Sequence, residues 1–375
     1  MLARRHKMQE GKVKEVLPMI AVIDADLIGR PKHNFPNLAC MKISGYYKAK
    51  GYKVVLKRDY EGLEAFDKVF ISKVFTDTPF PDEVLKLPNV EYGGTGFFYD
   101  KAPNLPDEIE HHMPDYDLYN EYVDERRSKG QKVSNYTDYS IGYLTRGCFR
   151  KCSFCVNQKY DRVVKHSPLA EFYNPDRKKI CLLDDNFFGC PDWKELLQGL
   201  IDTGRKFVFK QGLDERLLTD DKCKMLFSAK YDGDFIFAFD NIEDYPLIEK
   251  KLQLIRRYTS SKNVKFYVLC GFDRNGKYDS EFFLEDIKGV YTRIKLLAKY
   301  NAVPYLMRFN RHKEFDVAGV YTIMANWINW VPFFKKKSLV EVALQYKSYM
   351  QYLSDFKSKY PDFDFSLFFW KFEEE

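Results

Sequence analysis

The sequence has no apolar run approaching the roughly 20 residues that a helix needs to cross a bilayer. Its first 15 residues, MLARRHKMQEGKVKE, are charged and hold no apolar core, so they do not have the pattern of a secretory signal. Basic residues number 60 and acidic residues 54, and no basic stripe of the kind that follows phosphates is evident. The sequence therefore predicts a soluble protein with no membrane partner, and its charge does not indicate nucleic acid.

Other signatures are missing as well. Gly-rich phosphate fingerprints, Gly-Lys-Ser/Thr loops and the HExxH zinc motif do not occur. Only eight of the 375 residues are cysteine, and five of these lie far apart without a disulfide-like spacing: Cys40, Cys181, Cys190, Cys223 and Cys270. This usage favours a reducing compartment, and we expect a cytoplasmic protein.

The pattern of apolar segments predicts an α/β protein. After a tail over 1–12, strands and a helix alternate in a predicted doubly wound, Rossmann-like domain over 13–122. Its elements are strands at 16–24, 52–59, 68–75 and 90–94, and a helix at 38–51. The polar stretch 123–138 has no apolar periodicity, and we interpret it as a linker.

Six further apolar strands follow, with helices between several of them. They are predicted at 140–147, 179–186, 206–212, 234–240, 264–271 and 303–309. Repeated strand–helix units of this kind indicate a parallel barrel, here a partial one of six units over 139–310. The remaining residues, 311–375, have helical, aromatic-rich patterns and are expected to close the open side or bottom of the barrel.

Three cysteines, Cys148, Cys152 and Cys155, fall within the eight residues CFRKCSFC. A disulfide leaves an odd thiol, and a thioredoxin-like pair leaves Cys148 without a role. Zinc usually takes four ligands from two separated pairs, and the nearest fourth candidate is His166. Thiolates also hold iron–sulfur clusters, and three of them would leave one iron of a [4Fe-4S] cluster open for chemistry.

The spacing Cys148-x3-Cys152-x2-Cys155, with the aromatic Phe154 before the last cysteine, resembles the radical S-adenosylmethionine superfamily. In that family this loop follows the first strand of a six-unit barrel. The resemblance implies that the three cysteines hold a [4Fe-4S] cluster and that S-adenosylmethionine chelates the open iron. Its reductive cleavage gives a 5′-deoxyadenosyl radical that takes hydrogen from a substrate. An electron donor such as flavodoxin or ferredoxin is implied as a partner.

The resemblance also implies which residues contact S-adenosylmethionine. Phe154 would lie by the adenine. In LLDDNFFG, Asp184 and Asp185 stand where the family has a turn that binds the methionine amino group, with turn capping as the alternative. At later strand ends the candidates are Gln211, Arg216 for a carboxylate, Asp240 for the ribose, and Gly271 as a position of close approach.

The first domain resembles the cobalamin-binding domains of one subgroup of this superfamily. Their Asp-x-His-x-x-Gly, Ser-x-Leu and Gly-Gly motifs correspond in order to DADLIG (24–29), SKV (72–74) and GG (93–94). Asp26 replaces the axial histidine, and His33 lies nearby at a spacing that does not match. We therefore expect a domain that keeps the fold and has lost cobalamin, with binding lacking a protein axial ligand as the alternative.

The sequence thus predicts a radical S-adenosylmethionine enzyme whose substrate is left open among a nucleoside or tRNA base, a peptide and a small metabolite. No second cysteine cluster follows Cys155, which disfavours the branch that modifies peptides with auxiliary clusters. The alternative from another class is a non-catalytic module that binds nucleic acid, with zinc or an iron–sulfur cluster as a structural element.

Overall fold

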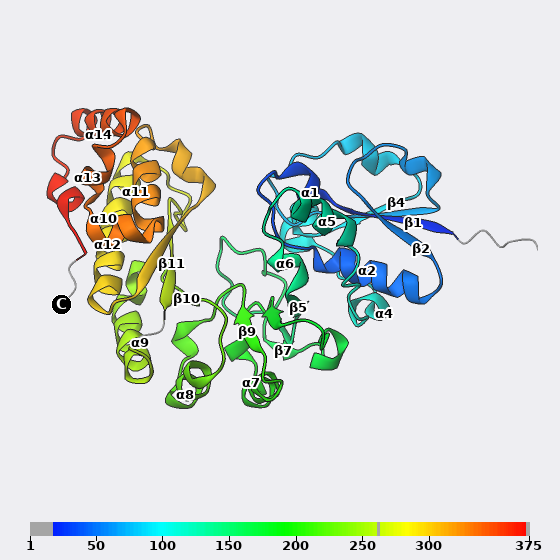
Figure 1. Ribbon diagram of the computed structural model, residues 1–375. Coiled ribbons are helices and arrows are strands. Elements are labelled where there is room, and N and C mark those ends of the chain that lie inside the picture. Colours follow the sequence, from blue (N-terminus) through cyan, green and yellow to red (C-terminus); the bar gives the residue numbers. More distant parts are fainter. Residues whose placement is uncertain (1–17, 261–262, 373–375) are drawn as a thin grey trace, which may run out of the picture. The chain divides into compact units, whose positions relative to one another are not determined.

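The computed structural model describes residues 18–260 and 263–372. The chain divides into two compact units, Met1–Thr137 and Asp138–Glu375, and each is described by itself (Figure 1). The tail predicted over 1–12 and the start of the strand predicted over 16–24 lie outside the described residues.

The first unit is built on a parallel sheet of four strands in the order β2-β1-β3-β4. The strands are β1 (Met19–Asp24), β2 (Lys53–Lys57), β3 (Lys68–Ser72) and β4 (Val90–Gly93). Alternate residues of β1 enter two different apolar cores, because side chains of a strand point to opposite faces. The crossover order with covered faces confirms the predicted Rossmann-like architecture.

The helices of the first unit are short, apart from the one predicted after the first strand. They are α1 (Ala25–Gly29), α2 (Leu38–Ala49), α3 (Thr95–Phe98), α4 (Asp107–Glu110), α5 (Asn120–Ser128) and α6 (Ser134–Thr137). Most of α5 and all of α6 fall in 123–138, which we interpreted as a linker. Val123, Val133 and Tyr136 are buried in the core of this unit, so the segment is folded. Its buried apolar residues are too few and too widely spaced to give a periodic pattern, so the sequence did not predict its helices.

The second unit contains the six parallel strands that the sequence predicts. They are β5 (Tyr139–Gly142), β8 (Lys179–Leu182), β9 (Lys206–Phe209), β10 (Phe235–Ala238), β11 (Val264–Cys270) and β12 (Val303–Arg308). They form two parallel sheets, β5-β8-β9 and β10-β11-β12, and an isolated parallel bridge pairs Phe207 of β9 with Tyr231, which precedes β10. Neighbours in the sheets follow chain order, as in a partial (βα)6 barrel.

Helices connect most of these strands. They are α7 (Trp193–Asp202), α8 (Asp220–Ser228), α9 (Tyr245–Tyr258) and α10 (Ser280–Lys299), and α7, α8 and α9 lie side by side along the strands in Figure 1. Between β5 and β8 the connection is instead a long loop that includes the antiparallel pair β6 (Thr145–Arg146) and β7 (Val164–Lys165). Within the described part of the chain, no helix has the length and apolarity to span a membrane.

The carboxyl-terminal residues form helices, as expected from their pattern: α11 (Gly319–Asn329), α12 (Val331–Lys336), α13 (Leu339–Ala343) and α14 (Lys347–Lys359). They share one apolar core with the barrel. The side chain of Asn329 accepts from Leu306 N at 2.7 Å and donates to Leu306 O at 3.1 Å. Leu306 lies in β12, at the end of the strand order, so α11 satisfies main-chain groups at this open edge, which unpaired strands otherwise expose.

Candidate functional site

The three clustered cysteines lie on the loop between β6 and β7. All are free thiols and partly exposed, whereas the other five cysteines are buried. Cys155 N donates to Cys152 O at 2.9 Å, and the Gln158 side chain donates to the carbonyl oxygens of both residues. These bonds fold residues 152–158 back on themselves, so that Cys152 and Cys155 share one tight turn.

Several N–H groups point at the thiol sulfurs. Arg150 N and the Asn186 side-chain amide each lie 3.4 Å from Cys148 Sγ, and Asn157 N lies 3.4 Å from Cys155 Sγ. Hydrogen bonds to cluster sulfurs are one means by which proteins tune iron–sulfur centres. The surroundings of these sulfurs therefore suit thiolate ligands as well as thiols.

Burial raises the pKa of the Cys152 and Cys155 thiols above the ordinary value. At Cys152 the Arg216 guanidinium opposes this, while the negative charge of Cys155 adds to it. The thiols thus lie near enough to repel one another when ionised. A cationic metal centre removes that repulsion, because metal ligation deprotonates a coordinating thiol.

The donor set fits a [4Fe-4S] cluster by its chemistry, because one partly exposed loop carries three soft sulfur ligands. Among the described residues, no group of three or more His, Cys, Asp or Glu is arranged to hold a single metal ion. His166, the fourth ligand considered for zinc, lies 3.0 Å from the Ser167 hydroxyl and packs edge-on to Tyr143.

Asp184 and Asp185 bind main-chain groups around the cysteine loop. Asp184 is buried and accepts from Leu144 N at 3.2 Å, Thr145 N at 2.6 Å and Thr145 Oγ1 at 2.6 Å. Asp185 accepts from Gly147 N at 3.0 Å and from the Asn157 side chain at 2.8 Å. The pair thus holds the loop on both sides of the cysteines, which corresponds to the capping alternative; contact with methionine stays a prediction.

Burial raises the pKa of Asp184 to about 7, although the Thr145 and Leu144 donors oppose the shift. Each of those donors favours the ionised carboxylate. Burial therefore outweighs the three hydrogen bonds at this carboxyl group.

Asp214, at the end of β9, joins two arginines beside the loop. It accepts from Arg150 Nε at 2.6 Å, from Arg216 Nε at 2.7 Å and from the Asn186 side chain at 3.3 Å. Burial works against the charged form, but the two guanidinium groups prevail and lower its pKa. Sequence reasoning found Arg216 and missed Asp214, Arg150 and Asn186, whose proximity arises only from folding.

The remaining candidates lie at the ends of other strands. Asp240 follows β10, where burial raises its pKa to about 6 against the opposing charge of Arg293. Phe154 packs edge-on to Phe272, with ring centroids 5.3 Å apart. Gly271, the neighbour of Phe272, has φ +70°, and a Cβ there would lie 2.6 Å from His312 Cβ. The close approach at Gly271 is therefore to this chain itself.

Gln211 is exposed, and its side chain makes no hydrogen bond to another described residue. Its proposed role thus rests on its position alone. It follows β9, and the carboxyl ends of parallel strands meet at one rim of a barrel.

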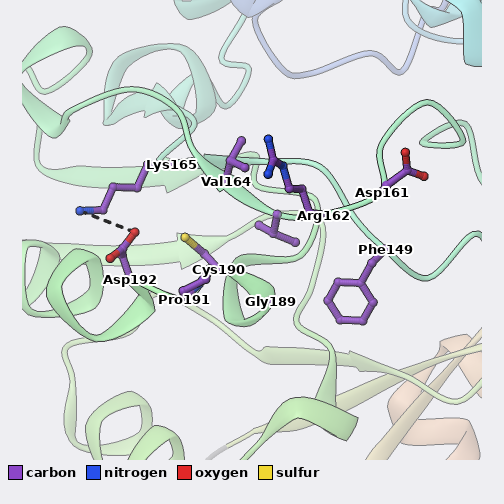
Figure 2. Close-up of a pocket in the computed structure, with 10 residues that line it drawn as sticks. Phe149, Asp161, Arg162, Val164, Lys165, Gly189, Cys190, Pro191 and Asp192 are labelled. Atoms are coloured by element: carbon purple, nitrogen blue, oxygen red, sulfur yellow. Dashed lines mark ion pairs between the residues drawn. The ribbon is translucent and has the colours of Figure 1, made fainter.

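A cavity of about 400 Å³ lies between residues of the cysteine loop and the segment 189–192 (Figure 2). Phe149, Arg162 and Val164 line it together with Cys190, and Lys165 lies 3.8 Å from Asp192 across it. None of the three clustered cysteines is among its lining residues. The cavity is therefore separate from the group of residues described above.

The buried Glu215 side chain is expected to make the stability of the protein depend on pH. Burial, aided by the charge of Asp214, raises its pKa to about 8 from an ordinary value of 4.5. The folded state then holds a proton that the unfolded state releases, so the stability from this group is lost as pH rises from about 4.5 to 8. We expect Glu215→Gln to unfold at a higher temperature than wild type at pH 8, by about 2–4 °C for each kcal/mol. Thermal midpoints at pH 5 and pH 8 measure this, and an equal decline in both proteins would contradict it.

In the first unit, the Asp26 carboxylate accepts hydrogen bonds from groups of this chain. It is 1% exposed and accepts from Val74 N at 2.7 Å, from Phe75 N at 3.4 Å and from the Thr78 hydroxyl. Its carboxylate thus holds the loop that follows β3.

The Gly-Gly motif at 93–94 also packs against groups of this chain. A Cβ at Gly94 would lie 2.2 Å from Lys73 O, and the buried Lys73 ammonium lies over the Phe97 ring at 5.1 Å. The groups that would bind cobalamin therefore pack against this chain. They do not fit the cofactor.

Neither a family model nor a curated protein matches the chain. Among solved structures it is similar to the cobalamin-dependent S-adenosylmethionine radical enzyme OxsB with aqua-cobalamin bound, at 12% identity and a TM-score of 0.44, over 74% of this chain and 52% of that one. Apo, selenomethionine-labelled OxsB gives 12% identity and a TM-score of 0.36, over 78% and 49%. The chain spans about half the length of these structures.

Proposed function

We propose that this protein is a radical S-adenosylmethionine enzyme. The observation that carries the proposal is a loop with three partly exposed thiols at the carboxyl-terminal rim of a parallel six-stranded unit. The other described cysteines are buried, so the loop supplies three ligands and no fourth. An incomplete ligand set suits a centre that binds a small molecule at its open position.

In this proposal Cys148, Cys152 and Cys155 hold a [4Fe-4S] cluster. When bound, such a cluster would supply the one electron that cleaves the C5′–S bond of S-adenosylmethionine, with methionine as the leaving group and the adenosyl fragment ending as 5′-deoxyadenosine after it takes a substrate hydrogen. A one-electron donor such as flavodoxin or ferredoxin restores the electron. The substrate belongs to one of three classes: a nucleoside or tRNA base, a peptide, or a small metabolite.

The chain's own residues prepare the rim for this chemistry. Asp184 and Asp185 fix the loop through main-chain hydrogen bonds. Arg216 and Asp240, a cation and an anion, follow β9 and β10 at the same carboxyl-terminal rim. Such a pair suits the carboxylate and the ribose or amino group of S-adenosylmethionine.

Metal analysis tests the proposal. Protein purified without oxygen, or reconstituted with iron and sulfide, is expected to hold about four iron and four sulfide per chain. One zinc with neither iron nor sulfide would favour the structural, nucleic-acid-binding alternative instead.

A further inference from the structure

Arg293 of α10 is a buried arginine that joins the ends of two strands. Its side chain is 3% exposed, and Nη1 donates to Phe239 O at 3.0 Å, Asp240 O at 2.9 Å and Leu269 O at 2.8 Å. The first two carbonyls follow β10, and the third belongs to β11. Because a buried charge is costly without partners, this geometry fixes both strand ends against one guanidinium group.

Asp286 supplies the counter-charge and extends the network. Its Oδ1 lies 3.8 Å from Arg293 Nη2, and its Oδ2 accepts from Gly271 N at 2.8 Å and from the Tyr321 hydroxyl at 2.7 Å. Tyr321 belongs to α11, in the carboxyl-terminal helices. The network therefore connects those helices to the turn that follows β11.

The strand ends held by Arg293 carry residues proposed for the site. Asp240, whose main-chain oxygen accepts from Arg293 at 2.9 Å, is the candidate for the ribose of S-adenosylmethionine. After β11, Phe272 contacts Phe154 of the loop. A shift of either strand end would move a group that borders the proposed S-adenosylmethionine site.

We propose that Arg293 is a positioning residue for S-adenosylmethionine, acting through Asp240 and the turn at Gly271 without touching the ligand. The inference rests on the proposed function. Asp286 orients Arg293. Tyr321 binds Asp286, so the carboxyl-terminal helices also help to hold the strand ends at the site.

Arg256 offers a matched control. It donates to Tyr300 O at 2.6 Å, Thr259 O at 3.0 Å and Asn301 O at 2.8 Å. These three carbonyls precede β11 and β12, so this arginine performs the same main-chain binding at the opposite end of the strands.

The experiment compares Arg293→Lys, Arg256→Lys and wild type after reconstitution, by iron content, thermal midpoint and equilibrium binding of S-adenosylmethionine. Arg293→Lys is expected to keep its iron and to lose about tenfold in affinity for S-adenosylmethionine, within the range by which networks of this kind modulate a site. Arg256→Lys is expected to lose stability and keep its affinity. Equal affinity in both variants and wild type would overturn the inference.

Tyr321→Phe keeps the test decisive if Arg293→Lys does not fold, because it removes only one hydroxyl group. Its expected loss is smaller, about two- to threefold in affinity with full iron content. Unchanged affinity in a folded Tyr321→Phe, with Arg293→Lys lost to misfolding, also counts against the inference. If wild type holds iron and sulfide but binds no S-adenosylmethionine, it is the proposed function that fails.

Discussion

Replacement of Cys152 by alanine is expected to remove most of the iron from the reconstituted protein. The loop supplies three thiols and no fourth, so the loss of one leaves two ligands for a four-iron centre. Iron and sulfide content, with the visible absorption of the reduced and oxidised protein, measures the effect. Wild-type iron content in Cys152→Ala would show that this thiol is not a ligand.

Cys190→Ala is the matched control for that experiment. Cys190 is also near the loop, since it lines the cavity of Figure 2 together with Phe149, but its side chain is buried. Its replacement is expected to cost some packing energy and no iron. Loss of iron from both variants to the same extent would point to general unfolding and would contradict a ligand role specific to Cys152.

Asp184→Ala is expected to lower the free energy of unfolding by about 3–5 kcal/mol. The change leaves Leu144 N, Thr145 N and the Thr145 hydroxyl without their acceptor in a buried place. Each stranded donor costs about 1–3 kcal/mol. Urea unfolding of the metal-free protein measures the loss apart from any effect on a cluster.

The same variant separates two roles of this position. If Asp184 served mainly to bind the methionine amino group, its removal would weaken S-adenosylmethionine binding and change stability by less than about 1 kcal/mol. Asp185→Ala is a useful companion, because that side chain is only partly buried and holds Gly147 N and Asn157. We expect it to cost less stability than Asp184→Ala.

The strands could be predicted because each is a short apolar run bounded by polar turns. All six barrel strands occur within the predicted segments or one residue from them, but the first, predicted over 140–147, ends at Gly142, and Thr145–Arg146 form the separate strand β6 ahead of the cysteines. The residues around the thiols could not be predicted in the same way. Asp214, Arg150 and Asn186 come from three separate connections, and only the fold brings them together.

The contacts of Asp26 could not be predicted from the sequence either. Its place in DADLIG predicted an altered cofactor site, but no local pattern indicates that its oxygens bind the loop at 74–78. Similarly, Val123, Val133 and Tyr136 anchor a stretch whose composition is that of a linker. In each case the contacts are distant in sequence, and periodicity carries no information about them.

Formation of 5′-deoxyadenosine is the most direct measurement of the proposed chemistry. We expect the reduced, reconstituted wild-type protein to produce it from S-adenosylmethionine, with no product when the reductant is omitted or when Cys152 is alanine. Wild-type protein that holds a full complement of iron and sulfide, accepts an electron and still yields no 5′-deoxyadenosine would contradict the proposal.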